Sequence, residues 1–208
     1  MKTYLQLNTS LFGDDAQSSR LAGQFVAALG YAEARSGTAN AVAPTVLVRD
    51  LGRHPVEHLT AERFTALATP AEQRTPAQQL VAAQSDALIA ELQVADVLVI
   101  GVPMYNFGVP STLKAYFDHV ARAGVTFRYT ETGPVGLLTG KKAYVVATRG
   151  GRHAGTPRDL QSAFVRQFLG FIGITDVEFV YAEGLALGEE SRAAAISAAG
   201  ARIEQLAA

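Results

Sequence analysis

Residues 101–110 carry the densest set of side chains that could hold a ligand. They read Gly-Val-Pro-Met-Tyr-Asn-Phe-Gly-Val-Pro, a thioether, two aromatic rings and an amide between prolines and glycines. The preceding residues 95–100 are short, β-rich and almost wholly apolar, which is typical of a strand buried on both faces of a parallel sheet. Open α/β sheets bind ligands beyond the carboxyl ends of such strands. These side chains suit a flat, heteroaromatic, hydrogen-bonding ligand.

Within this segment, Asn106 is the residue that argues for a ligand. The alternative for Met104, Tyr105, Asn106 and Phe107 is a hydrophobic lid that packs on the core. A buried amide between two rings must find hydrogen-bond partners or cost a few kcal/mol, and a lid would not supply them. A ligand with a donor and acceptor edge, such as the pyrimidine end of a flavin, would.

A second polar segment follows the first predicted strand. Ser10 and then Ala16-Gln17-Ser18-Ser19 lead into a helix, whose free N–H groups and partial positive charge suit a phosphate. Taken alone, an ordinary serine cap is the better interpretation of these hydroxyls. No Gly-x-Gly-x-x-Gly motif follows, and we expect no acidic residue at the ribose position of the second strand. The pattern therefore predicts a monophosphate site.

The third segment, residues 148–153, reads Thr-Arg-Gly-Gly-Arg-His. Adjacent glycines let a backbone approach a ligand closely, and His153 could lend positive charge or a hydrogen bond. The alternatives are a solvated loop histidine and, for Arg149 and Arg152, ordinary surface charges. We interpret His54, His58 and His119 as structural or solvent-facing.

The elements between these segments alternate between strand and helix. We predict strands over residues 3–8, 45–49, 95–100, 142–148 and 177–182, with helices after each and a loop over 32–44. The first helix should end at Gly30, and a capping box at Thr75 should start another that runs to about Gln93. Such alternation predicts one domain over 1–208, with a five-stranded parallel sheet ordered 2-1-3-4-5 and helices on both faces. All three segments would then meet at one edge of the sheet.

Composition excludes several classes of function. The formal charge is −1, with 18 basic and 19 acidic residues and no basic run, which argues against a nucleic-acid binder. The absence of cysteine excludes disulfides, thiolate catalysis and cysteine-held metal, and we expect no metal site. Neither a signal peptide nor an apolar run of membrane-spanning length is visible, so we expect a cytoplasmic protein. Asp118 and Arg122 have the spacing of a helix ion pair.

Together, the three segments resemble the bacterial, flavodoxin-like FMN-dependent NAD(P)H:quinone oxidoreductases known as azoreductases. The resemblance is carried by residues 104–107, 109–114, 118, 122–130, 133–134, 140–142, 149–151 and 168–173. It is dense over 95–190 and poor over 30–75. It implies a flavodoxin-like three-layer sandwich and a homodimer with one FMN per subunit, each site being completed near the subunit interface.

The resemblance also implies roles for individual residues. Ser10, Gln17 and Ser18 would hold the FMN phosphate. Members of the family usually have serine at the position of Ala16, so here this residue would contribute only its backbone N–H, and Ser19 could compensate for the missing hydroxyl. The rest of the cofactor site would comprise Met104, Tyr105, Asn106, Phe107, Thr148, Arg149, Gly150, Gly151 and His153. Phe107, Tyr129 and Phe171 would wall the substrate pocket. No protein group is expected to be catalytic, because the flavin carries the chemistry.

The implied reaction is a ping-pong transfer of hydride from NADH or NADPH through FMN to quinones, with reductive cleavage of azo compounds to aromatic amines. No motif distinguishes the two nicotinamides. A non-enzymatic flavodoxin-like electron carrier is one alternative, although such carriers usually have a strongly acidic surface for docking. An FMN-binding regulatory protein is another. A hydrolase is disfavoured because no Gly-x-Ser-x-Gly motif is found.

Overall fold

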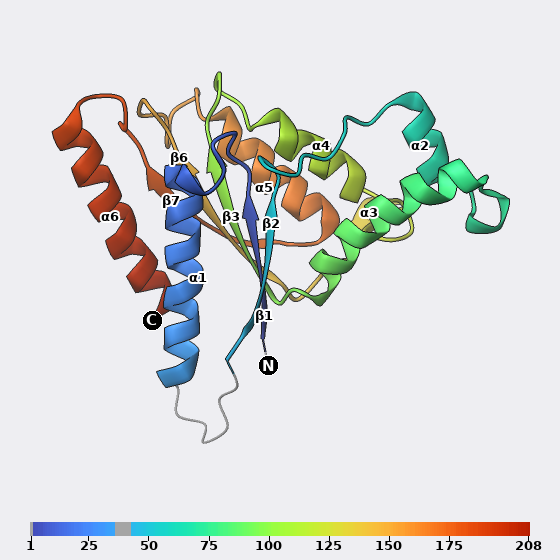
Figure 1. Cartoon of the computed structure of the whole chain (residues 1–208), viewed down its shortest axis with the longest axis horizontal. Helices are drawn as coiled ribbons and strands as arrows, with labels where there is room; N and C mark the ends of the chain where they lie inside the picture. The colour runs from blue at the N-terminus through green and yellow to red at the C-terminus, as the bar shows by residue number, and fades with distance from the viewer. Residues whose placement is uncertain (1, 36–42) are drawn as a thin grey trace.

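The main structural element is a parallel sheet. The computed structural model describes residues 2–35 and 43–208, and five strands form the sheet in the order β2-β1-β3-β6-β7 (Figure 1). They are β1 (Thr3–Asn8), β2 (Thr45–Asp50), β3 (Val97–Pro103), β6 (Lys142–Thr148) and β7 (Asp176–Ala182). A separate antiparallel hairpin consists of β4 (Phe127–Thr130) and β5 (Gly133–Gly136). The predicted order 2-1-3-4-5 of the main sheet is therefore confirmed.

Helices cover both faces of the sheet (Figure 1). One layer contains α1 (Gln17–Arg35) and α6 (Glu189–Ala207), and the other contains α3 (Pro76–Val94), α4 (Ser111–Val120) and α5 (Leu160–Ile172). The remaining pieces are α2 (Ala61–Ala68), which contacts α3, and short 3-10 turns at Gly13–Asp15 and Ala71–Gln73. Leu98 and Ile100 belong to one buried cluster and Val99 to the other, because successive side chains of a strand point to opposite faces.

The register of the central strands places their carboxyl ends side by side. Asn8 of β1 lies opposite Gly101 of β3, and Pro103 of β3 lies opposite Thr148 of β6. The three polar segments of the sequence begin at or just beyond these residues. The strand order thus brings them to one edge of the sheet, as predicted.

Several boundaries differ from the prediction, among them the start of β3, which lies at Val97 and not at residue 95. Helix α1 continues past Gly30 to Arg35, and Gly30 keeps a helical backbone, so it does not end the helix. Residues 32–35 of the predicted loop are consequently helical, and residues 36–42 lie outside the described part of the chain. Strand β3 extends through Pro103, three residues further than expected, because Gly101 to Pro103 still pair with β6. The capping box of α3 is confirmed by the bonds between Thr75 and Gln78.

Two polar interpretations were also wrong. Strand β2 does end on an acidic residue, Asp50, but its carboxylate accepts hydrogen bonds from the N–H groups of Gly52 and Arg53 and so serves the turn. The pair expected between Asp118 and Arg122 does not form, since α4 ends at Val120. Asp118 instead accepts hydrogen bonds from Lys114, and Arg122 reaches Asp86 at 3.0 Å.

No helix within residues 2–35 and 43–208 is long and apolar enough to cross a bilayer.

His119 is structural, as expected, and buried. Its side chain is fully inaccessible, and Nε2 lies 3.0 Å from the carbonyl oxygen of Glu57. Burial is the main reason why the pKa of His119 lies below the usual 6.5. His54 and His58 are exposed.

We predict that His119 makes stability depend on pH. The pKa of His119 is about 6.5 in the unfolded chain and lower in the folded chain. Between these two values the unfolded chain binds a proton at this side chain and the folded chain does not. Stability from His119 is therefore complete above pH 6.5 and is lost as the pH falls. Urea unfolding at about pH 7.5 and about pH 5.5 should show a larger loss for wild type than for His119→Gln. Equal losses in the two proteins would contradict this.

Candidate cofactor site

Direct hydrogen bonds join the three polar segments at the carboxyl edge of the sheet. The Ser10 and Tyr105 hydroxyls lie 3.0 Å apart, although 95 positions separate them in sequence. The Met104 N–H donates to the Thr148 carbonyl oxygen at 2.9 Å. The segments that follow β1, β3 and β6 therefore form one structure.

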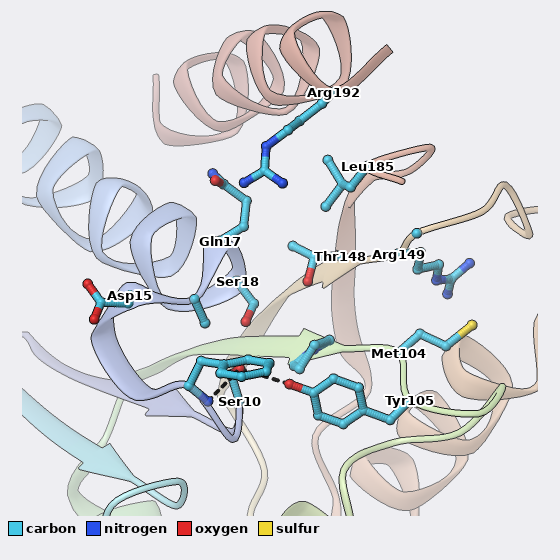
Figure 2. Close-up of a pocket in the computed structure, with 14 residues that line it drawn as sticks. Ser10, Asp15, Gln17, Ser18, Met104, Tyr105, Thr148, Arg149, Leu185 and Arg192 are labelled. Atoms are coloured by element: carbon cyan, nitrogen blue, oxygen red, sulfur yellow. Dashed lines mark hydrogen bonds between the residues drawn. The ribbon is translucent and has the colours of Figure 1, made fainter. Parts of the chain in front are cut away.

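A cavity of about 450 Å³ opens between these segments (Figure 2). This volume falls within the range of small-molecule and cofactor sites. The loop after β1 and the start of α1 line it, together with the ends of β3 and β6, the segment that joins β7 to α6, and α6 itself. The lining residues are Ser10, Phe12, Asp15, Ala16, Gln17, Ser18, Pro103, Met104, Tyr105, Thr148, Arg149, Gly150, Leu185 and Arg192.

One end of the cavity is built from the N-terminus of α1. In the described chain, the amide N–H groups of residues 17–19 have no hydrogen-bond partner, and the first bond of the helix runs from the Arg20 N–H to the Ala16 carbonyl oxygen. The Ser18 hydroxyl is also buried without a partner, and Ser18 lines the cavity. Several hydrogen-bond donors and the positive end of the helix dipole are therefore available to an anionic ligand.

Gly101 allows α1 to start so close to the sheet. A Cβ on Gly101 would lie 2.7 Å from the backbone oxygen of Ser18, which no side chain could tolerate. The first turn of α1 therefore rests directly on the end of β3. This contact sets the distance between the donors of α1 and the residues that follow β3.

Ser10 has a second structural role that the sequence does not reveal. Its hydroxyl oxygen accepts a hydrogen bond from the Phe12 N–H at 3.2 Å, in addition to its contact with Tyr105. Ser10 thus connects two loops while it lines the cavity. The hydroxyls of Ser18 and Ser19, in contrast, have no partner within the described residues, and of the two only Ser18 lines the cavity.

Residues 105–108 form a tight two-residue hairpin turn. Tyr105 and Gly108 exchange backbone hydrogen bonds, and the central residues Asn106 and Phe107 have φ of 50° and 66°. Left-handed backbone at both central positions is typical of a type I′ turn, for which Phe is a costly choice. Asn106 is exposed, so the premise that its amide is buried between two rings was wrong.

Phe107 and His153 form an aromatic pair outside the residues that line the cavity. Their rings meet edge to face with centroids 5.8 Å apart, and Phe107 remains 56% exposed. Phe107 therefore does not pack as a lid on the core. The pair joins the turn after β3 to the loop after β6.

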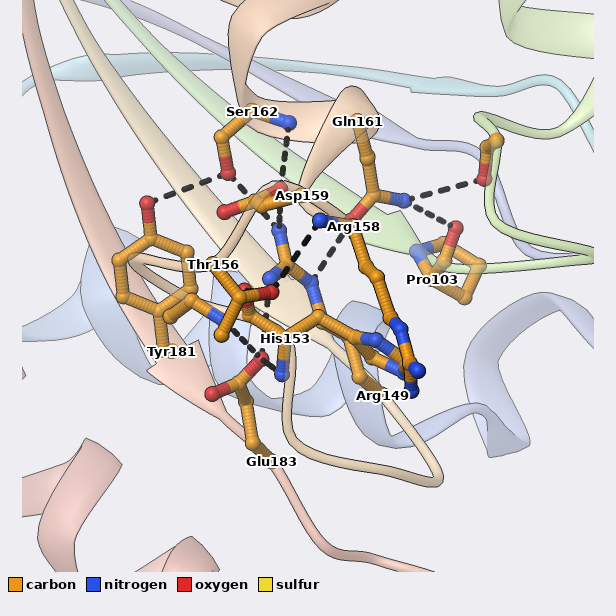
Figure 3. Close-up of polar contacts among 12 residues, drawn as sticks. Pro103, Arg149, His153, Thr156, Arg158, Asp159, Gln161, Ser162, Tyr181 and Glu183 are labelled. Atoms are coloured by element: carbon orange, nitrogen blue, oxygen red, sulfur yellow. Dashed lines mark hydrogen bonds and ion pairs between the residues drawn. The ribbon is translucent and has the colours of Figure 1, made fainter.

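The loop after β6 is held by a buried arginine. The Arg149 side chain is fully buried, and its guanidinium donates to Asp159 at 2.7 Å, Glu183 at 2.9 Å and Gln161 at 3.1 Å (Figure 3). This excludes the surface-charge alternative for Arg149. Burial alone would raise the pKa of Asp159, but hydrogen bonds from Arg149 and Ser162 outweigh it and hold the pKa below its usual value.

Glu183 connects this buried charge to the glycine loop. The same carboxylate oxygen that faces Arg149 also accepts the N–H groups of His153 and Ala154, at 2.8 and 2.9 Å (Figure 3). Within the described residues, the N–H groups of Gly150 and Gly151 have no partner. The network therefore orders the loop and leaves two backbone donors free, as a site for a polar or negative ligand edge requires.

The two remaining aromatic residues of the predicted pocket lie elsewhere. Tyr129 packs on Phe127, which packs on Phe171, with ring centroids 5.3 and 4.3 Å apart. Helix α5 starts at the cavity edge of the sheet and ends at the opposite edge, where the Leu138 N–H donates to Ile172. Phe171 and Tyr129 thus lie at the far end of α5, and one chain does not bring them to Phe107.

The structure unites most of the predicted cofactor residues. Ser10, Ala16, Gln17, Ser18, Met104, Tyr105, Thr148, Arg149 and Gly150 line the cavity, whereas Asn106, Phe107, Gly151 and His153 do not. Sequence reasoning missed Phe12, Asp15, Pro103, Leu185 and Arg192. Proximity to a predicted strand end could have indicated the first four, but Arg192 lies inside a helix and carries no sequence signal.

We predict that Glu183→Gln destabilises the fold by about 2 kcal/mol, because it leaves the buried Arg149 charge with one carboxylate. Glu178→Gln is the matched control, since Glu178 of β7 faces Arg202 of α6 at 3.6 Å in an exposed ion pair. That change should cost less than about 1 kcal/mol. Chemical denaturation measures both, and equal losses would show that the network does not stabilise the loop.

Comparison with known proteins agrees with this geometry. The chain matches a family model described as a flavodoxin-like fold over residues 2–207. It is 55% identical over 193 residues to the FMN-dependent NADH:quinone oxidoreductase of Cellvibrio japonicus, which covers 93% of each chain. It is 52% identical over 199 residues to FMN-dependent NADH:quinone oxidoreductase 6 of Burkholderia lata, which covers 96% of each.

Solved structures show the same architecture. An azoreductase of Bacillus anthracis superimposes with a TM-score of 0.86 at 26% identity, over 100% of this chain and 99% of that one. An FMN-dependent NADH-azoreductase of the same organism, solved in complex with FMN, gives a TM-score of 0.84 at 25% identity over 100% of both chains. The family model covers nearly the whole chain, and the first relative is more than half identical to it. The chain therefore belongs to the flavodoxin-like family of FMN-dependent NADH:quinone oxidoreductases.

Proposed function

We propose that this chain uses FMN to transfer two electrons from NADH to quinones, and that it cleaves azo compounds by the same route. The observation that carries the proposal is that one cavity has unpaired hydrogen-bond donors at one end and ring-contacting side chains at the other. Unpaired donors of α1 define one end, while Met104, Tyr105, Thr148 and Gly150 define the other. The names of the relatives supply FMN, NADH and quinone.

The residues present fit a flavin mononucleotide. The free N–H groups of residues 17–19 and the buried Ser18 hydroxyl would bind the phosphate without any lysine. Ala16 adds no hydroxyl, and the Ser10 hydroxyl is shared with Tyr105 and Phe12. These donors suit a single phosphate group, which agrees with a mononucleotide.

The opposite end of the cavity fits the ring system. Met104 and Tyr105 would contact the ring, and the unpaired N–H group of Gly150 would donate to its polar edge. When bound, FMN supplies the group that accepts and returns the hydride. The protein's part is to bind, to orient and to exclude water, so no side chain is assigned a catalytic role.

A second copy of the chain would complete the substrate pocket. Tyr129 is 75% exposed and lies at the far end of α5, away from the cavity and from Phe107 of the same chain. We infer a homodimer in which Tyr129 and Phe171 of one subunit wall the site of the other. Flat aromatic substrates would then stack between rings from both subunits.

The function is tested by colour and turnover. Protein saturated with FMN should be yellow, should bleach on anaerobic addition of NADH, and should regain its absorbance when a quinone is added. NADPH, assayed separately, should bleach it more slowly. A colourless protein after saturation, or a reduced protein that no quinone reoxidises, would exclude the proposed reaction.

Two neighbouring serines provide a matched test of the phosphate end. Both hydroxyls are buried without partners, but only Ser18 lines the cavity. Ser18→Ala should weaken FMN binding about tenfold, or about 1.4 kcal/mol, while Ser19→Ala should not. Fluorescence titration of the apoprotein measures both. If the two variants bind FMN equally well, the hydroxyl of Ser18 does not hold the phosphate.

The dimer is tested by light scattering and by one aromatic substitution. The wild type should have twice the mass of one chain. Tyr129→Ala should raise the KM for quinone about fivefold, which corresponds to about 1 kcal/mol of ring contact, without slowing flavin reduction by NADH. Tyr31→Ala, which removes another exposed tyrosine, should leave the KM unchanged. A monomeric active enzyme would refute the shared pocket.

A further inference from the structure

Arg192 is the lining residue whose position the fold does not explain. It lies in the first turn of α6, and its guanidinium points from α6 toward the cavity beside the Gln17 side chain (Figure 2). In the part of the chain that the structure describes, this guanidinium forms no hydrogen bond, ion pair or ring contact. A cation there is free to bind an external group.

Stability does not account for an arginine at this place. The first turn of a helix is its positive end, where a cation is unfavourable by roughly 0.3–1 kcal/mol. Glu189 and Glu190 occupy the same turn and complement the dipole, but no ion pair joins either to Arg192. Arg192 is exposed, and no hydrogen bond or ion pair within the described residues holds its guanidinium in place.

Arg192 is also the one uncommitted cation among the described residues that line the cavity. The other lining arginine, Arg149, directs its guanidinium to Asp159 and Glu183. The one acidic lining residue, Asp15, pairs with Arg20 at 3.3 Å, and its side chain is 92% exposed. The net charge offered to a ligand at this end therefore comes from Arg192.

The opposing wall has the complementary features. The N-terminus of α1 presents its free N–H groups, and the buried Ser18 hydroxyl lacks a partner. Ala16 contributes no side-chain donor. Arg192 and the start of α1 thus face the same space from two different helices (Figure 2). A phosphate between them would meet neutral donors on one side and a full charge on the other.

We propose that Arg192 binds the phosphate of the flavin mononucleotide from the side of α6. The inference rests on the proposed function, because it takes FMN as the occupant. Arg192 supplies charge and a planar pair of donors, which suit phosphate oxygens. It thereby makes affinity depend on the phosphate group as well as on the ring.

The test compares FMN with riboflavin, which has the same ring system and no phosphate. Fluorescence titration of the apoprotein should show that Arg192→Gln weakens FMN binding about tenfold, and leaves the riboflavin affinity within about twofold. Added salt should weaken FMN binding less in this variant than in wild type, because one charged contact is gone. Arg192→Lys keeps the charge and should retain FMN affinity within about threefold.

Arg202→Gln is the matched control, since Arg202 lies on the same helix, contacts Glu178 and Gln205, and does not line the cavity. It should bind FMN as wild type does. Unchanged FMN affinity in Arg192→Gln would overturn the inference, as would an equal loss for riboflavin. If wild type itself fails to bind FMN, the proposed function fails instead, and the two outcomes are distinguishable.

Discussion

The parallel register of β1, β3 and β6 is the constraint on which the site depends. Asn8 pairs beside Gly101, and Pro103 beside Thr148, so these strands deliver their following loops to one edge. Side chains then lock the arrangement, as the hydroxyls of Ser10 and Tyr105 show. The cavity is a consequence of strand order and register, and the loops only decide what it can hold.

The two ends of the cavity present hydrogen-bond donors of different origin. At the start of α1 the donors are backbone amides and a hydroxyl, placed there because Gly101 lets the helix approach. At the glycine loop the donor is the unpaired amide of Gly150, in a loop where Glu183 accepts the N–H groups of His153 and Ala154. The buried positive charge of Arg149 pairs with Asp159 and Glu183 inside the protein and orders the loop.

The sequence predicted the sheet order and the meeting of three loops because short apolar, β-rich runs and strand–helix alternation are local signals. It misplaced the end of α1, since Gly30 resembles a terminator but stays helical. The burial of Asn106 was also misjudged, because the sequence of a turn does not show whether its side chains face the solvent or the core. Arg192 was invisible, because only the packing of α6 beside α1 brings it to the cavity.

The turn at Asn106 and Phe107 has a consequence for how this protein can be altered. Asn-Gly is the favoured pair for such a turn, and an L-residue at φ of 66° costs of the order of 1–3 kcal/mol. Glycine at position 107 would relax that backbone, so selection for heat resistance would favour it. The same replacement would strip the ring that meets His153. A more stable turn and the aromatic contact with His153 therefore place opposite demands on position 107.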